Sequence, residues 1–207
     1  YAHIKEFDSL VCYLRFAKDS RKKGVNILLY GTPGTGKSEL AKILAKNINA
    51  NLYRVRVNDN DGDAQDGEAR IGSYLLAQRF LDANKDILLY DEVEDVLNYD
   101  SDDKFKNKAF FNEALENNAV PTIWITNKIY KVDSAVVRRF DFAIAMNAPK
   151  KGVRKAMLNK ICGEKLDKKT LKLAQKSPNL APAIINKATE ISSVLNGDFS
   201  KNFLMLV

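Results

Sequence analysis

Eight consecutive residues near the start of the chain have the types and spacing of a phosphate-binding loop. They follow the apolar run Ile27 to Tyr30 and fit the pattern G-x-x-x-x-G-K-S as Gly31, Thr32, Pro33, Gly34, Thr35, Gly36, Lys37 and Ser38. A strand that leads into a glycine-rich turn and then a helix directs backbone N–H groups and the positive helix end toward one anion. Lys37 supplies a cation for the β- and γ-phosphates, and the Ser38 hydroxyl is a hard oxygen ligand for Mg²⁺. We therefore expect this loop to bind a nucleoside triphosphate with Mg²⁺.

A second apolar run, Ile87 to Tyr90, ends in two adjacent carboxylates, Asp91 and Glu92. At the end of a strand beside the phosphate loop, Asp91 can support Mg²⁺ directly or through water. Glu92 can then act as general base on the attacking water. The pair predicts hydrolysis of the triphosphate, because binding alone needs no base.

Strands and helices alternate up to about residue 148, which is typical of a parallel α/β sheet covered on both faces. Apolar runs predict strands over 27–30, 52–57, 87–90 and 122–126. Helical spacing predicts helices over 39–48, 68–83 and 105–117, the second with its apolar positions at Ile71, Leu75, Leu76 and Phe80. The phosphate loop and the acidic pair should then lie on neighbouring parts of one sheet.

The segment Asn147-Ala148-Pro149 marks a break in this alternation. Beyond it, helical patterns cover about 150–161, 167–175 and 181–195, with no further convincing strand. The sequence therefore predicts an α/β phosphate-loop domain over 1–148, followed by a small all-helical domain over 149–207.

With these motifs the chain resembles the AAA+ family of ATPases over nearly its whole length. Thr122 to Asn127 is similar to the fourth core strand of the family and its polar sensor, which implies that Asn127 positions water or senses the γ-phosphate. The segment from Val132 to Asp141 is similar to the family segment that carries arginines acting on a neighbouring subunit, which here are Arg138 and Arg139. The Pro-Gly that commonly separates them is missing, and the sequence does not choose between the two.

The resemblance implies an ATPase that binds ATP and Mg²⁺ and works as a homo-oligomeric, hexameric ring. The helical domain corresponds to the lid of the family, and Asn179 to Ile184 match the start of its third helix. No arginine follows Arg154, as in the lids of protein-remodelling members, which implies a protein client. The loop 58–68 departs from those members, because it is acidic and lacks the aromatic residue that grips a polypeptide.

Two other functions compete with a protein-remodelling motor. Residues 149–207 hold 12 of the 33 basic but only 4 of the 26 acidic side chains, so this lid could hold nucleic acid in a loader or initiator. Solvated helix faces explain the same lysines, and we favour that interpretation. A nucleotide-gated scaffold is the third hypothesis, and the intact Asp91, Glu92 and Asn127 argue against it.

Composition limits the setting of the protein. Cys12 and Cys162 stand far apart, which indicates neither a disulfide framework nor a zinc site and favours a reducing, cytoplasmic location. No apolar stretch approaches the roughly 18 residues that span a bilayer, so we expect no membrane partner. The chain opens on Tyr1 and is expected to be a fragment of a longer protein, whose other domains would determine client and process.

Overall fold

The computed structural model describes residues 4, 6–58, 62–63, 65–96, 104–177 and 180–207, with the backbone alone at 95 and 104–110. The chain divides into two compact units. The first comprises Tyr1–Gly31 and Lys37–Ala145, and the second comprises Thr32–Gly36 and Met146–Val207.

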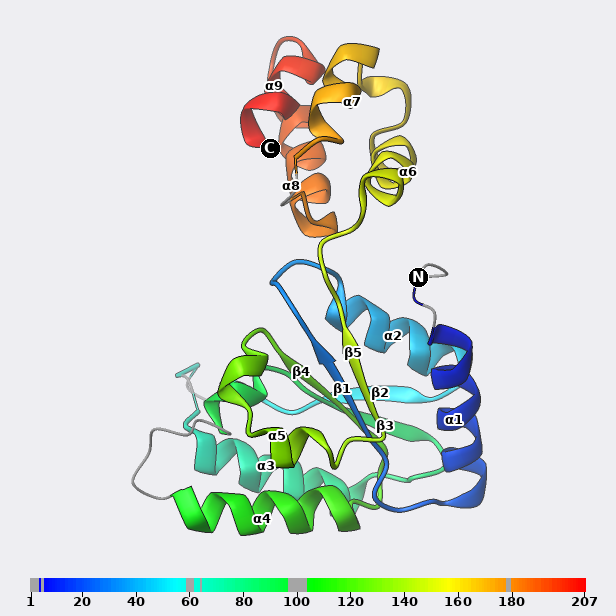
Figure 1. Ribbon diagram of the computed structural model, residues 1–207, viewed down its shortest axis with the longest axis vertical. Helices are drawn as coiled ribbons and strands as arrows, with labels where there is room; N and C mark the ends of the chain where they lie inside the picture. Colours follow the sequence, from blue (N-terminus) through cyan, green and yellow to red (C-terminus); the bar gives the residue numbers. More distant parts are fainter. Residues whose placement is uncertain (1–3, 5, 59–61, 64, 97–103, 178–179) are drawn as a thin grey trace. The chain divides into compact units, whose positions relative to one another are not determined.

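The first unit is built on a five-stranded parallel sheet in the order β2-β3-β4-β1-β5 (Figure 1). Its strands are β1 (Asn26–Tyr30), β2 (Asn51–Arg54), β3 (Asp86–Tyr90), β4 (Thr122–Thr126) and β5 (Phe142–Ala145). The four predicted strands are confirmed, although β2 ends at Arg54 and not at 57. The sequence does not predict β5, an edge strand in which only Ile144 is buried.

Helices cover both faces of this sheet, as predicted. They are α1 (Phe7–Ser20), α2 (Lys37–Asn47), α3 (Gly67–Phe80), α4 (Lys104–Asn117) and α5 (Ser134–Val137), with short 3₁₀ turns η1 (Val93–Asp95) and η2 (Ile129–Lys131). Figure 1 shows α1 and α2 together on one face and α3, α4 and α5 on the other. Neither α1 nor α5 is predicted from the sequence.

The buried side of α3 differs from the predicted one. The helix itself is confirmed, but its buried side chains are Arg70 and Tyr74, one turn apart. Ile71 is half-buried, whereas Leu76 and Phe80 are 57% and 80% exposed. Tyr74 packs into the core, with Ile71 partly buried beside it, so the helix orients by this aromatic residue and by the contacts of Arg70, while Leu75, Leu76 and Phe80 are exposed.

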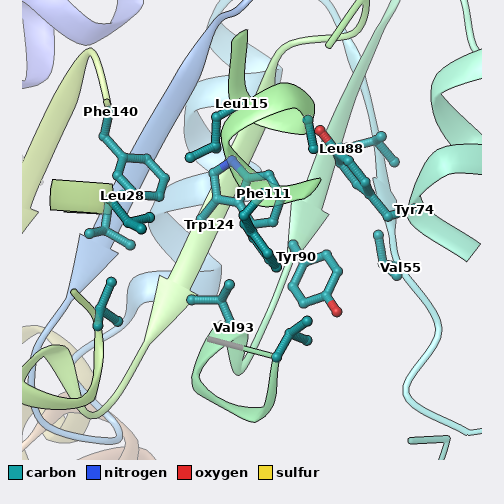
Figure 2. Packing of buried hydrophobic residues seen from close by; sticks show 14 of the residues in the cluster. Leu28, Val55, Tyr74, Leu88, Tyr90, Val93, Phe111, Leu115, Trp124 and Phe140 are labelled. Atoms are coloured by element: carbon teal, nitrogen blue, oxygen red, sulfur yellow. The ribbon is translucent and has the colours of Figure 1, made fainter. Parts of the chain in front are cut away.

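An aromatic cluster around Trp124 fills the space between the sheet and helices α3, α4 and α5 (Figure 2). Trp124, in the central strand β4, is 1% exposed and stacks on Tyr90 of β3 with ring centroids 5.1 Å apart. Tyr74, Phe111 and Phe140 surround the same indole at centroid distances of 5.0, 5.8 and 6.3 Å. The indole N–H donates to Asn26 Oδ1 over 2.9 Å, so its polar atom is also satisfied.

The second unit carries four α-helices among its described residues, which are α6 (Lys151–Cys162), α7 (Lys168–Ala174), α8 (Pro182–Val194) and α9 (Phe199–Leu206), with the 3₁₀ turn η3 (Gly163–Lys165). The first three confirm the predicted helices, and α9 is additional. Their core contains Leu158, Ile185 and Phe203, all fully buried. Arg154, the last arginine of the chain, donates to the carbonyl oxygens of Pro149 and Gln175 and so braces this unit internally.

We predict that Trp124→Ala lowers the free energy of unfolding by about 3–5 kcal/mol, because it removes a large buried side chain and leaves Asn26 without its indole donor. Urea unfolding followed by far-UV circular dichroism measures this loss. The matched control is Tyr130→Ala, which removes an aromatic ring that is 79% exposed and should change stability by no more than about 0.5 kcal/mol. Equal unfolding midpoints for the two variants would contradict the central role of the cluster.

Candidate functional site

Three parallel strands end next to one another and deliver the predicted site residues to one edge of the sheet. β4 lies between β1 and β3, with Tyr30 of β1 opposite Thr126 and Tyr90 of β3 opposite Trp124. Gly31, Asp91 and Asn127 each follow directly on one of these strands. The phosphate loop, the acidic pair and the sensor residue therefore start from adjacent strand ends.

The phosphate loop has the backbone that its sequence requires. Gly34 and Gly36 have φ values of +76° and +94°, in the left-handed region that disfavours other residues. Thr35 donates its hydroxyl to the Thr32 carbonyl oxygen over 2.9 Å, which closes the turn. Helix α2 then begins at Lys37. The loop thus ends at a helix N-terminus, where an anion is favoured.

Lys37 is held in place at the start of α2. It is only 5% exposed, and its Nζ donates to the Gly31 carbonyl oxygen over 2.8 Å. Burial lowers the pKa of its ammonium group, while the negative charges of Asp91 and Glu94 oppose that shift. The two carboxylates therefore help to keep a charged lysine at the phosphate loop.

The acidic strand end meets the phosphate loop through Asp91. The Ser38 hydroxyl donates to Asp91 Oδ2 over 3.5 Å, and the Glu92 N–H donates to Asp91 Oδ1 over 3.1 Å. Glu92 is exposed, and its backbone is left-handed, with φ 57° and ψ 49°. Asp91 thus turns toward the loop, while Glu92 leaves its carboxylate accessible.

Asn127 is half-buried at the end of β4, and its backbone N–H donates to Glu94 Oε1 over 3.2 Å. Glu94 is 6% exposed, and its Oε2 is buried without a hydrogen-bond partner among the described residues. The Glu94 carboxylate lies on the 3₁₀ turn that follows the acidic pair. It accepts a hydrogen bond from Asn127, and its negative charge also favours the charged form of Lys37. Glu94 was not predicted, although it stands only two residues after Glu92.

The oxygen donors at this edge fit Mg²⁺. The Ser38 hydroxyl and the Asp91 carboxylate are hard oxygen ligands close to each other. Within the described part of the chain, no group of three or more His, Cys, Asp or Glu side chains could hold a metal. Mg²⁺ commonly takes one or two protein ligands and completes its shell with water and substrate phosphate, so this small donor set is sufficient.

Two arginines that the sequence analysis did not single out also contact the acidic strand end. Arg54, at the end of β2, forms an ion pair with Asp91 Oδ2 at 2.9 Å, and its side chain is 55% exposed. Arg70 of α3 is buried and donates to the backbone carbonyl oxygens of Asp91 and Glu92. Strand alternation could have drawn attention to Arg54, because basic and apolar residues alternate over 52–57. No local pattern identifies Arg70.

The structure brings Arg138 and Arg139 to the other end of the sheet. Both lie between α5 and β5, just before β5 pairs with the first residues of β1 through Phe142 and Ile27. The following Asp141 accepts hydrogen bonds from the Asn26 N–H and from the Tyr13 hydroxyl, each over 2.7 Å. β1 separates this end from Gly31 by five residues, roughly 16 Å at 3.3 Å per residue.

The two arginines differ in their surroundings. Arg139 Nη1 forms an ion pair with Glu116 of α4. Arg138 is exposed, and its guanidinium makes no hydrogen bond or ion pair to any residue that the structure describes; only its backbone N–H is bonded, to the Ser134 carbonyl oxygen. The burial of Tyr13 and its hydrogen bond to Asp141 both raise the pKa of the tyrosine, which keeps it a donor. The segment is thus fixed to the sheet by Asp141 and leaves one guanidinium without a partner among the described residues.

Comparison with known proteins assigns the family. Residues 27–148 match the "ATPase family associated with various cellular activities (AAA)". The chain belongs to the AAA ATPase family. Membership implies ATP binding and hydrolysis and agrees with the fold described above. Members of this family typically oligomerise.

Distant relatives of this AAA chain include a spastin homolog and a homolog of a proteasome regulatory subunit. A spastin homolog of Caenorhabditis elegans is 27% identical over 155 residues, which cover 69% of this chain and 30% of that protein. A 26S proteasome regulatory subunit homolog of Methanothermobacter thermautotrophicus is 31% identical over 144 residues, or 65% and 38% of the two chains. The chain therefore spans about a third of the length of these curated relatives.

The crystal structure of the FIGL-1 AAA domain in complex with ADP has the same fold. It superposes with a TM-score of 0.67 at 14% identity and covers 98% of this chain and 79% of its own.

No helix among the described residues of this AAA chain is long and apolar enough to cross a membrane. Of the acidic loop predicted over 58–68, residues 59–61 and 64 lie outside the described residues, as does Asn179 in the lid motif.

Proposed function

We propose that this AAA module hydrolyses Mg²⁺-bound ATP and that, as one subunit of a homo-oligomeric ring, it uses the turnover to remodel a protein client. The observation that carries the proposal is the meeting of the phosphate loop and the acidic strand end, with Ser38 Oγ 3.5 Å from Asp91 Oδ2. We also propose that residues 1–148 form the nucleotide-binding domain and that residues 149–207 form its lid.

Each residue at the strand ends then has a role. Backbone N–H groups of the loop Gly31 to Gly36, to which Pro33 contributes none, and the Lys37 ammonium hold the phosphates, and Ser38 and Asp91 hold Mg²⁺. When bound, Mg²⁺ would offset charge on the β- and γ-phosphate oxygens. Glu92 takes a proton from the attacking water, and Asn127 orients that water. The accessible Glu92 carboxylate supports this assignment.

The arginine segment supports a ring. Arg138 and Arg139 lie at the end of β1 away from the phosphate loop, so an arginine that acts on ATP would act on the site of a neighbouring subunit. Because Arg139 is paired with Glu116, we assign the trans role to Arg138. Arg139 would then hold the segment against α4.

The relatives favour a protein client, since one of them is a proteasome regulatory subunit homolog. The competing nucleic-acid hypothesis draws on the lysines of the second unit, but these are exposed residues spread over all four of its described helices and the turns beside them. A nucleic-acid partner would make turnover rise with added DNA or RNA and fall steeply with salt.

A cytoplasmic location is retained as a prediction, with Cys12 and Cys162 both free thiols.

The proposal is tested first by Glu92→Gln. We predict that this variant loses turnover by roughly 10²–10⁴-fold, because the amide cannot accept the proton, while its affinity for Mg²⁺-ATP stays within about twofold. Phosphate release and binding of a fluorescent ATP analogue measure the two effects. Glu68→Gln, which removes an exposed carboxylate in the first turn of α3, is the matched control and should behave like wild type. Unchanged turnover in Glu92→Gln would remove Glu92 from its role.

The trans role of Arg138 is tested by mixing subunits. We predict that Arg138→Ala and Glu92→Gln are each inactive alone, and that the mixture recovers activity at about a quarter of the interfaces by random pairing. Recovery follows because a Glu92 of one variant meets the Arg138 of the other. Arg139→Ala should retain most of its activity alone. An inactive mixture, or an inactive Arg139→Ala beside an active Arg138→Ala, would overturn the assignment.

A further inference from the structure

Arg70 is a charged residue in a buried position. It lies one turn into α3 and is 1% exposed, among the most buried large side chains of the chain. A buried charge is costly unless polar groups and aromatic faces compensate for it. The groups that contact this guanidinium therefore indicate why the position carries an arginine.

Three of those groups lie at the end of β3. Arg70 Nη2 donates to the Asp91 carbonyl oxygen, and Nη1 donates to the Glu92 carbonyl oxygen over 3.4 Å. The guanidinium carbon lies 4.7 Å from the ring centroid of Tyr90, the last residue of the strand. The guanidinium thus contacts three successive residues: Tyr90 through its ring, and Asp91 and Glu92 through their carbonyl oxygens. None of these three contacts uses the carboxylate of Asp91 or Glu92.

The backbone that Arg70 holds is an unusual one. Glu92 has φ 57° and ψ 49°, a left-handed conformation that a residue with a long side chain rarely adopts without support. This conformation sets the direction in which the Glu92 carboxylate leaves the strand. Because the two carbonyl oxygens on either side of this turn are both acceptors for Arg70, the guanidinium stabilises the turn that aims the carboxylate.

We propose that Arg70 is a positioning residue for ATP hydrolysis, which holds the Asp91–Glu92 turn so that the Glu92 carboxylate faces the attacking water. The inference rests on the proposed role of Glu92 as general base. Arg70 itself touches neither substrate nor metal in this account. A lysine keeps the charge but has no planar fork to hold two carbonyl oxygens and one ring at once.

The test compares Arg70→Lys and Arg70→Met with Arg79→Met, which changes an exposed arginine on the same helix. A misplaced base reduces the chemical step far more than nucleotide binding. We expect kcat to fall by roughly 10²-fold in Arg70→Lys, with KM and Mg²⁺-ATP affinity within about threefold of wild type. Arg79→Met should retain both. Should Arg70→Met fail to fold, Arg70→Lys carries the test, since it keeps a cation at this buried position.

A double variant separates positioning from general destabilisation. If Arg70 acts through Glu92, adding Arg70→Lys to Glu92→Gln lowers the residual single-turnover rate by less than about twofold, because the base is already lost. Multiplicative losses would overturn the proposal, as would a wild-type kcat in Arg70→Lys or a loss of ATP affinity equal to the loss of kcat. Wild-type turnover in Glu92→Gln alone would instead show that the proposed function has failed.

Discussion

The parallel pairing of β3, β4 and β1 is the constraint on which the rest of the site depends. Because the three strands run side by side in one direction, the residues that follow them emerge at one edge of the sheet. The strands are mostly apolar and buried on both faces, so a shift in register would move core side chains as well as site residues. The Trp124 cluster stabilises this register at its centre, where β3 and β4 stack Tyr90 on the indole.

Charges at that edge are balanced within the chain. The Asp91 carboxylate accepts hydrogen bonds from Ser38, Arg54 and the Glu92 N–H. The Glu94 carboxylate accepts one from the Asn127 N–H. Lys37 lies in the field of both carboxylates. Arg54 is the exposed partner, so its ion pair with Asp91 is weak and can yield to a divalent cation or to phosphate. The buried Arg70 instead binds the backbone carbonyl oxygens of Asp91 and Glu92 and lies over the ring of Tyr90, contacts that use neither carboxylate.

Much of the fold and of the candidate site follows from local sequence patterns. The glycine-lysine-serine loop and the Asp-Glu pair are visible because each comes directly after a short apolar run, and the central strands are visible because burial on both faces makes them continuously apolar. β5 is harder to predict, since an edge strand with one buried side chain carries little periodic signal. The short α5 is fixed by contacts of Val136 and Phe140 with the core rather than by its own length.

Arg70 and Tyr74 show why the rest could not be predicted. Hydrophobic spacing in α3 favours a face with Leu75, Leu76 and Phe80, but the buried face is the one where an aromatic ring meets Trp124 and a guanidinium meets the backbone of β3. Both contacts join segments about 20 residues or more apart in sequence, so they exist only once the sheet has formed. From sequence alone an arginine is predicted to be exposed, because the acceptors that allow its burial are visible only in the folded structure.

The central claim is that the strand ends form one Mg²⁺-ATP site, and the most direct measurement is ATP hydrolysis as a function of Mg²⁺ concentration for the wild-type chain and Asp91→Asn. We expect no turnover without Mg²⁺ and a saturable rise in the wild type. We also expect that Asp91→Asn needs about ten- to a hundredfold more Mg²⁺ for half-maximal turnover, because a support of the metal is lost. Identical Mg²⁺ dependence in the two proteins would contradict the claim.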